Sequence, residues 1–170
     1  MRELRLYPRW SWGAKSPRMP LEEHRLRRVI VHHSGQPRVA DYRGPETIRW
    51  IQRFHMDERG WADIGYHFVI APDGTIYEGR PLLYVGAHVK HQNAGSLGIC
   101  VLGDFRKGMD TVPLRAARAL QELLTWCVDS LHIPPEAIYP HSAFSATECP
   151  GELVHLVRWF RPKLEAVYRR

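Results

Sequence analysis

Short runs of β-branched and apolar residues alternate along this chain with segments whose apolar residues recur at helical spacing. The clearest strand signals are Val29 to His33 and Leu97 to Leu102, and the clearest helix signal follows Thr111 and Pro113 and runs to Leu131. Strands interleaved with helices are typical of proteins in which helices cover a central sheet. The order of elements therefore predicts a single-domain α/β fold, with a central mixed β-sheet flanked by about three helices.

Weaker local signals complete the predicted fold. Pro72-Asp73-Gly74 favours a tight turn, so the alternating segments on either side of it should pair as a hairpin. Pro162 lies inside the last helical segment and is expected to bend it. The remaining expected elements are a helix over residues 45–58 that Gly60 ends, hairpin strands over 66–71 and 75–77, an extended segment over 138–140 and a helix over 151–168.

The length and composition are those of one ordinary globular domain. With 170 residues, 44% of them hydrophobic, the chain can bury about two thirds of its unfolded surface. We divide it into an N-terminal extension, residues 1–25, and a domain over residues 26–170. The extension contains Trp10 and Trp12 and is expected to pack on the domain, since both tryptophans would otherwise be exposed. Neither a membrane span nor a secretory signal is expected, because no apolar run is long enough.

The net charge of +6 favours an anionic partner such as nucleic acid, a phospholipid surface or an acidic cell-wall polymer. The basic residues occur in small groups, such as residues 25–28, and do not form a long run interleaved with aromatic residues. No nucleic-acid-binding module is recognisable, so we expect no nucleic-acid partner. Most of this charge is expected to be ordinary solvated surface.

The three cysteines fall into two environments. Cys100 lies in the apolar run of a predicted strand and Cys127 on the apolar face of a predicted helix, so both are expected to be free core thiols. Cys149 differs from them, because it lies in a polar loop between Glu148 and Pro150, where a core thiol has nothing to pack against. Cys149 is therefore the cysteine to which we assign chemistry.

A metal site is the simplest use of this thiol. His141 precedes Cys149 on the same short loop, and His32 and His33 end a predicted strand far upstream. Two imidazoles and a thiolate suit zinc, and three protein ligands leave the fourth tetrahedral position open for water, as in catalytic zinc sites. No CxxC or HxxxH pair lies nearby to close the site as a structural one. If His32 faces the metal, His33 faces the opposite side of the sheet, since side chains alternate along a strand.

Several motifs that lie in order over nearly the whole chain carry a resemblance to a known family. They are Trp10 to Ala14, Val29 to Ser34, Arg59 to Phe68, Gly79-Arg80, Gly86 to His88, Ser96 to Ile99 and His141 to Gly151. Together they resemble the peptidoglycan recognition proteins and the related zinc-dependent N-acetylmuramoyl-L-alanine amidases, which include the phage lysozyme-type amidases.

The resemblance implies a catalytic site. It implies one zinc ion held by His32, His141 and Cys149, with Tyr66 and Thr147 assisting the reaction. Catalytic members keep the cysteine, whereas purely recognising members replace it, often with serine. The resemblance therefore implies an amidase that hydrolyses the amide bond between muramic acid and L-alanine, in peptidoglycan or in smaller muropeptides.

The resemblance also implies substrate contacts and a preferred substrate. Gly60-Trp61 before the Asp-Ile-Gly-Tyr segment implies stem peptides of the diaminopimelate type, with Arg80 pairing with the additional carboxylate. His67 neighbours Tyr66 on a predicted strand, so a structural role is an alternative for it. The expected substrate contacts are Gly60, Trp61, His67, Arg80, His88 and Asn93.

Two other functions remain open at this point. One is a binding module that recognises peptidoglycan without cutting it, against which Cys149 argues. The other is a cysteine peptidase with Cys149 as nucleophile and His141 as base, which leaves His32 without a role. We expect a monomer, and the sequence assigns no cellular location.

Overall fold

The computed structural model describes residues 4–168. A six-stranded sheet in the order β1-β4-β3-β5-β2-β6 forms its centre. The strands β3 and β4 are antiparallel, and the other neighbouring pairs are parallel, so the sheet is mixed as predicted. The strands are β1 (Leu6–Tyr7), β2 (Arg28–His33), β3 (Phe68–Ile70), β4 (Ile76–Glu78), β5 (Ser96–Val101) and β6 (Ile138–Pro140).

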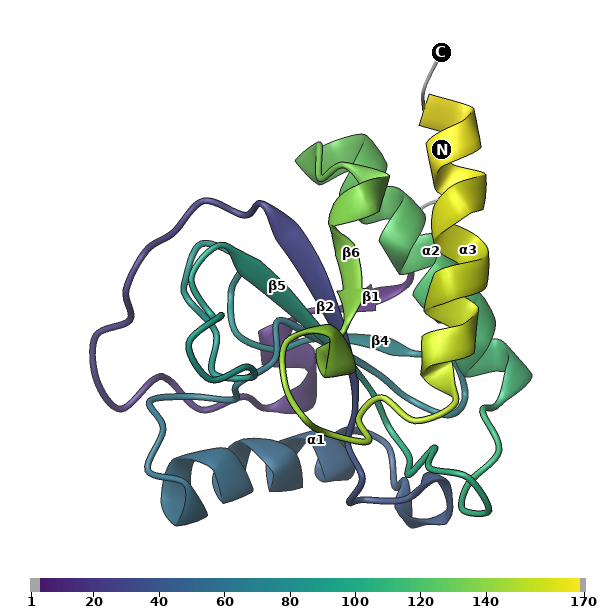
Figure 1. Ribbon diagram of the computed structural model, residues 1–170. Coiled ribbons are helices and arrows are strands. Elements are labelled where there is room, and N and C mark those ends of the chain that lie inside the picture. Colours follow the sequence, from purple (N-terminus) through teal and green to yellow (C-terminus); the bar gives the residue numbers. More distant parts are fainter. Residues whose placement is uncertain (1–3, 169–170) are drawn as a thin grey trace.

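Three α-helices cover the sheet, and the predicted α/β fold is confirmed. α2 (Leu114–Leu131) and α3 (Leu153–Tyr168) pack on one face of the sheet, whereas α1 (Pro45–Arg53) lies across the other face (Figure 1). One π-helical turn, Phe54–Glu58, continues α1, and Gly60 follows it with a positive φ of 69°. None of these helices is long and apolar enough to cross a membrane.

Several element boundaries differ from the prediction, among them the start of the first hairpin strand, which is Phe68 and not residue 66. Pro113 takes the N-cap position and α2 begins at Leu114, so Thr111 makes no cap. α3 begins at Leu153 and continues through Pro162 to Tyr168. The two-residue strand β1 was not predicted, because two exposed residues are too few to show an alternating pattern.

Alternation along the strands sends successive side chains to opposite faces of the sheet. Val29 and Val31 of β2 belong to the large core cluster beneath α2 and α3, which also contains the predicted core thiol Cys127. His32 points to the other face, where a smaller cluster around Ile48 and Ile51 of α1 lies. Any site that uses His32 is therefore on the α1 face of the sheet.

The N-terminal extension contacts the domain through a buried anchor. The Trp12 side chain is fully buried, and its Nε1 donates a 2.8 Å hydrogen bond to the carbonyl of Glu78. The guanidinium of Arg9 lies 2.9 Å from the buried carboxylate of Asp63. Trp10 is 83% exposed, contrary to the expectation that both tryptophans are covered. Trp10 and Trp12 lie on opposite sides of the 3₁₀ turn Arg9–Trp12, and only the side with Trp12 faces the core.

These two tryptophans allow a matched stability test. We expect Trp12→Ala to lower the free energy of unfolding by about 3–5 kcal/mol, because it removes a large buried side chain. Trp10→Ala should change the same quantity by no more than about 0.5 kcal/mol, as is usual for exposed positions. Urea denaturation of both variants measures the difference. Equal effects would contradict the anchoring role of Trp12.

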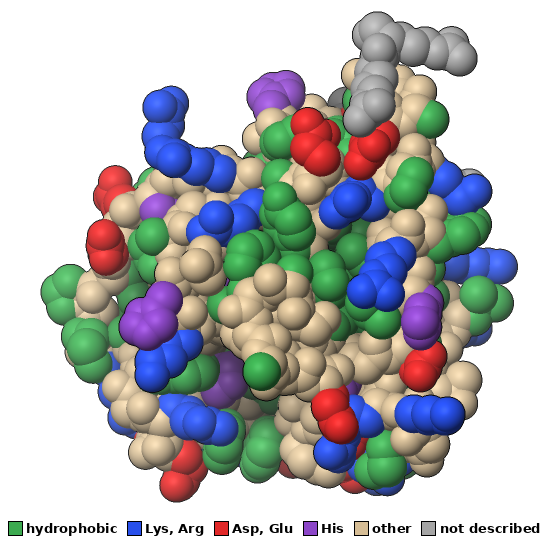
Figure 2. All heavy atoms as spheres, viewed as in Figure 1, with side chains coloured by type: hydrophobic (Ala, Val, Ile, Leu, Met, Phe, Trp, Pro, Cys, Tyr) green, Lys and Arg blue, Asp and Glu red, His purple; other side chains and the backbone are tan. Residues whose placement is uncertain are grey.

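Basic side chains are scattered over the visible face of the molecule and do not gather into one block (Figure 2). Several of them are paired with acids, as in Arg38 with Asp110 at 2.7 Å and Arg106 with Asp104 at 2.5 Å. The distribution agrees with the solvated surface expected from the sequence.

Candidate metal centre

The sheet register brings the two histidines together. β6 pairs in parallel with β2 and places Pro140 opposite Val31. The next residues along the two strands, His141 and His32, are therefore neighbours, and their ring centroids lie 4.6 Å apart. The loop before α3 then returns Cys149 to the end of β2, where its Sγ accepts a hydrogen bond of 3.3 Å from the amide that follows His32.

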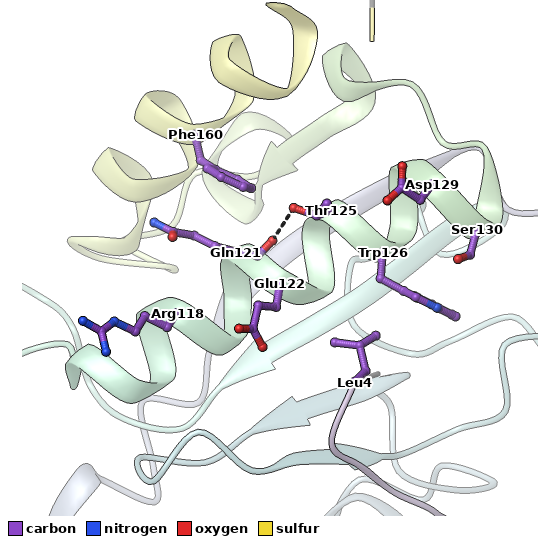
Figure 3. A pocket seen from close by; sticks show the side chains of 9 residues that line it. All are labelled: Leu4, Arg118, Gln121, Glu122, Thr125, Trp126, Asp129, Ser130 and Phe160. Carbon is purple, nitrogen blue, oxygen red and sulfur yellow. Dashed lines mark hydrogen bonds between the residues drawn. The ribbon is translucent and has the colours of Figure 1, made fainter. Parts of the chain in front are cut away.

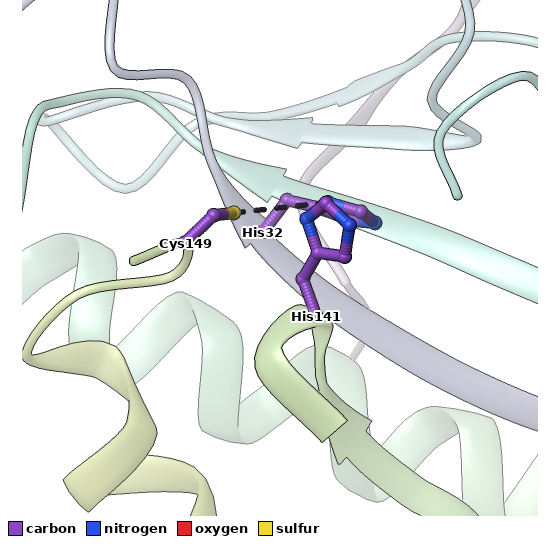
Figure 4. A group of neighbouring side chains, drawn as sticks. All are labelled: His32, His141 and Cys149. Carbon is purple, nitrogen blue, oxygen red and sulfur yellow. Dashed lines mark hydrogen bonds between the residues drawn. The ribbon is translucent and has the colours of Figure 1, made fainter. Parts of the chain in front are cut away.

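The three side chains converge as the sequence predicted. One potential ligand atom from each of His32, His141 and Cys149 lies within 4.8 Å of the other two. They come from a strand, a short turn and a loop and point toward a common centre (Figure 4). The His32 Nδ1 atom lies 3.8 Å from the Cys149 Sγ atom. The Nδ1 atom of His141 is buried and has no hydrogen-bond partner among the described residues. A buried nitrogen in that state fits a metal ligand.

The electrostatics of the centre also fit a cation. Burial lowers the pKa of His32 well below its ordinary value, and the neighbouring His88 and His141 lower it further. Burial lowers the pKa of His141 as well, so both imidazoles are neutral, the form that binds metals. Burial raises the pKa of the Cys149 thiol to about 12. A thiolate in this position therefore needs a nearby positive charge, which a divalent ion supplies.

Tyr66 lies beside the centre, just before β3. Its ring centroid is 5.5 Å from that of His32 and 5.4 Å from that of His55. Burial raises the pKa of Tyr66 well above its ordinary value, and the thiols of Cys100 and Cys149 raise it further. The hydroxyl therefore keeps its proton and is a hydrogen-bond donor at the edge of the centre.

Thr147 acts on the loop that carries the thiol. Its Oγ1 accepts a hydrogen bond of 3.2 Å from the backbone amide of Cys149. The hydroxyl thus helps to set the backbone that presents the Sγ atom to His32. This hydrogen bond does not test a part in the reaction. The role that the sequence analysis gave Thr147 therefore stays a prediction.

Residues 22–152 match the N-acetylmuramoyl-L-alanine amidase family. The chain belongs to this family. Peptidoglycan-recognition protein LB of Drosophila melanogaster is 39% identical over 154 residues, which cover 86% of this chain and 64% of that protein. The N-acetylmuramoyl-L-alanine amidase of Homo sapiens is 34% identical over 154 residues, or 86% of this chain and 26% of that protein. The chain thus spans about a quarter to two thirds of these two relatives.

Solved structures of peptidoglycan recognition proteins share the fold. The Drosophila peptidoglycan recognition protein SD superposes with a TM-score of 0.83 at 30% identity, over 92% of this chain and 94% of that chain. Peptidoglycan recognition protein LE, solved in complex with tracheal cytotoxin, superposes with a TM-score of 0.74 at 31% identity, over 95% of this chain and 93% of that chain. A His-His-Cys group in this fold is consistent with the zinc site of the amidase family.

Arg80, the predicted carboxylate partner, makes backbone contacts within this amidase-family domain. Its side chain is buried, and its guanidinium donates to the backbone carbonyls of Ile64, Val85 and Asp63 at 2.9, 2.7 and 3.1 Å. The three carbonyls use three of its five N–H donors. Arg80 therefore joins segments of the fold, and its pairing with a substrate carboxylate stays a prediction.

The contacts of His67 agree with the structural role that the sequence analysis gave as an alternative, although residues 66 and 67 precede β3 and do not lie on it. Its side chain is fully buried, its Nδ1 accepts the amide of Gly98 at 2.9 Å, and its Nε2 lies 2.8 Å from the carbonyl of Tyr84. Both ring nitrogens are thus used within the fold, which leaves none for a substrate. His33 faces away from His32, and its Nδ1 accepts the amide of Phe105 at 3.0 Å.

The other predicted substrate residues differ in their contacts and in their exposure to solvent. His88 contacts His32 directly, through a 2.9 Å approach of its Nδ1 to the Nε2 of His32. The side chain of Asn93 accepts the amides of His88 and Val89 and so holds that loop. Gly60 is exposed, and Trp61 is half-buried against His55, with ring centroids 4.7 Å apart. These positions remain predicted substrate contacts.

The sequence analysis assigned no role to His55, and the structure places this residue beside the centre. His55 is buried next to Tyr66, and its Nδ1 accepts the amide of Gly65 at 2.9 Å. Burial lowers the pKa of His55 to about 4, so it stays neutral. The sequence contained a signal for this burial, because Ile48, Ile51 and His55 lie on one stripe of the helix at spacings of three and four.

A separate groove of about 460 Å³ lies along α2, on the sheet face away from the metal centre (Figure 3). Trp126 and Phe160 form its apolar walls, and Leu4 of the N-terminal segment lies at its edge. It shares no residue with the candidate centre.

Proposed function

We propose that this chain is a zinc-dependent N-acetylmuramoyl-L-alanine amidase that hydrolyses the amide bond between muramic acid and L-alanine. The observation that carries the proposal is the intact His32, His141 and Cys149 group on the α1 face of an amidase-family fold. Three protein ligands are the number that a catalytic zinc site uses, since the fourth position stays open for water.

His32, His141 and Cys149 would hold the metal. When bound, zinc supplies a Lewis acid that polarises the scissile carbonyl and lowers the pKa of a water molecule. Attack of water on the amide carbon moves negative charge onto the carbonyl oxygen. The Tyr66 hydroxyl keeps its proton and lies next to His32, so it is placed to donate a hydrogen bond to that oxygen.

The centre argues against the two alternative functions. A non-catalytic binding module has no need of a buried thiol whose Sγ atom lies 3.8 Å from an imidazole nitrogen. A cysteine peptidase needs a thiol with a lowered pKa, yet burial raises the pKa of Cys149 to about 12. Cys149 also precedes the first residue of α3, Leu153, by four positions, so the helix start does not activate it.

We infer that the substrate is peptidoglycan, or muropeptides, of the diaminopimelate type. Gly60 and Trp61 support this inference through the family resemblance, and the ring of Trp61 contacts that of His55, which in turn contacts the ring of Tyr66. The related protein LE is solved with tracheal cytotoxin, a monomeric diaminopimelic acid-type peptidoglycan. Arg80 uses three of its five N–H donors on backbone carbonyls, so a contact with the additional carboxylate would use the other two.

Mass spectrometry of muropeptides tests the activity. We expect incubation with the zinc-loaded protein to release free stem peptides that begin with L-alanine. A chelator should stop the reaction, and added zinc should restore it, because the proposed reaction requires the zinc that the three ligands hold. Release that continues unchanged in metal-free protein would contradict the proposal.

The same assay tests the stem-peptide preference. We expect kcat/KM for a diaminopimelate-containing muropeptide to exceed that for its lysine-containing counterpart. The resemblance implies that members with Asn-Phe at this position prefer lysine-type stems. Replacing Gly60-Trp61 by Asn-Phe should therefore reduce the ratio of the two values, while zinc content stays unchanged. Equal kcat/KM values for both substrates in the unmodified protein would refute the preference and leave the amidase proposal intact.

A further inference from the structure

The two ring nitrogens of His32 have different neighbours. Nδ1 faces the Sγ atom of Cys149 at 3.8 Å, whereas Nε2 lies 2.9 Å from the Nδ1 atom of His88. The rings of His32 and His88 are nearly perpendicular, at 88°, with centroids 5.0 Å apart. His88 therefore lies behind His32 as seen from the thiol, which is not a position from which it can act as a fourth ligand.

This arrangement determines where the ring protons must be. A neutral imidazole carries its proton on one nitrogen and accepts on the other. If Nδ1 of His32 binds a metal, the proton of His32 is on Nε2 and is donated to Nδ1 of His88. The proton of His88 is then on its own Nε2, which is buried. Burial lowers the pKa of His88 well below its ordinary value, and a backbone hydrogen bond to Ser96 acts in the opposite direction.

The surroundings of His88 hold its ring rigidly. The side-chain oxygen of Asn93 accepts the backbone amides of His88 and Val89, each at 2.8 Å. A Cβ atom added at Gly98 would lie 2.6 Å from the His88 ring, and one added at Gly86 would lie 2.7 Å from it. Glycine at both positions thus leaves the space that the ring fills. A rigidly held acceptor is what orients a metal-binding histidine.

We propose that His88 is a positioning residue for the metal centre: it accepts the Nε2–H of His32 and so fixes the tautomer and the orientation of that ligand. The sequence analysis placed His88 as a substrate contact, and the proposal gives it a role that exists without substrate. The inference rests on the proposed function in one respect, namely that His32 binds zinc.

Zinc affinity, measured by competition with a chromophoric chelator in the absence of substrate, tests the proposal. We expect His88→Leu, which keeps the volume but loses the acceptor, to weaken zinc binding by about 10- to 100-fold. His88→Asn places an amide oxygen near the original Nδ1 and should keep most of the affinity. His155→Leu, at an exposed position on α3, is the control and should bind zinc like the unmodified protein.

The outcomes separate this proposal from the amidase proposal. If the unmodified protein binds no zinc, the proposed function fails. If it binds zinc and folded His88→Leu binds equally well, the positioning role alone is refuted, as it is if His88→Asn binds as weakly as His88→Leu. NMR of the ¹⁵N-labelled unmodified protein, zinc-loaded, does not depend on how the variants fold. A proton on Nε2 of both His32 and His88 supports the proposal, and a proton on Nδ1 of either ring overturns it.

Discussion

Replacing Cys149 by serine is expected to abolish hydrolysis and to remove most of the bound zinc, while the fold persists. A serine hydroxyl keeps its proton at neutral pH and is a poorer ligand for zinc than a thiolate. The loop should hold its position, because Thr147 still accepts the amide of residue 149 and the ring of Phe144 packs against Tyr139 at a centroid distance of 5.2 Å.

Zinc content per chain, muropeptide hydrolysis and binding to the cell-wall polymer should be measured together on Cys149→Ser. Binding should be retained in part, since the predicted substrate contacts do not include the thiol. Cys127→Ala is the matched control: that thiol is buried between α2 and the sheet, so the change should cost stability but leave zinc content unchanged. Full activity of Cys149→Ser would remove the thiolate from the centre.

Tyr66→Phe is expected to lower kcat by about 100- to 1,000-fold, the usual loss when one donor to a developing oxyanion is removed. The ring remains, so its packing against His32 and His55 should remain as well. KM should change much less than kcat, because the lost hydrogen bond forms mainly as charge develops on the substrate oxygen.

Steady-state kinetics with a defined muropeptide distinguish these effects. Tyr84→Phe serves as the control, because Tyr84 lies outside the centre and lines a hollow formed with residues 17–21. Zinc content of Tyr66→Phe should equal that of the unmodified protein. An unchanged kcat would remove Tyr66 from the mechanism, whereas a parallel loss of zinc would assign it a structural role.

Local pattern was sufficient for most of the fold. The β-branched run ending at His33, the Pro72-Asp73-Gly74 turn and the apolar period of α2 each predicted an element that the structure contains. The same local rule placed His32 and His33 on opposite faces of the sheet, and the family resemblance identified His32 as the ligand. It could not detect β1, whose two residues pair with β4 at the sheet edge.

The chemistry of the candidate centre was also readable from residue types, since a thiol in a polar loop and histidines at strand ends are unusual outside a site. Sequence alone thus determined the fold class and the three donors. The tertiary structure decided which other residues belong near them. It buried Arg80 and His67 in backbone hydrogen bonds, brought His55 beside Tyr66 and placed His88 behind His32. The physical reason is the distance along the sequence over which each signal acts. Periodicity and residue chemistry are local, whereas burial and hydrogen-bond partners depend on segments that meet only when the sheet forms.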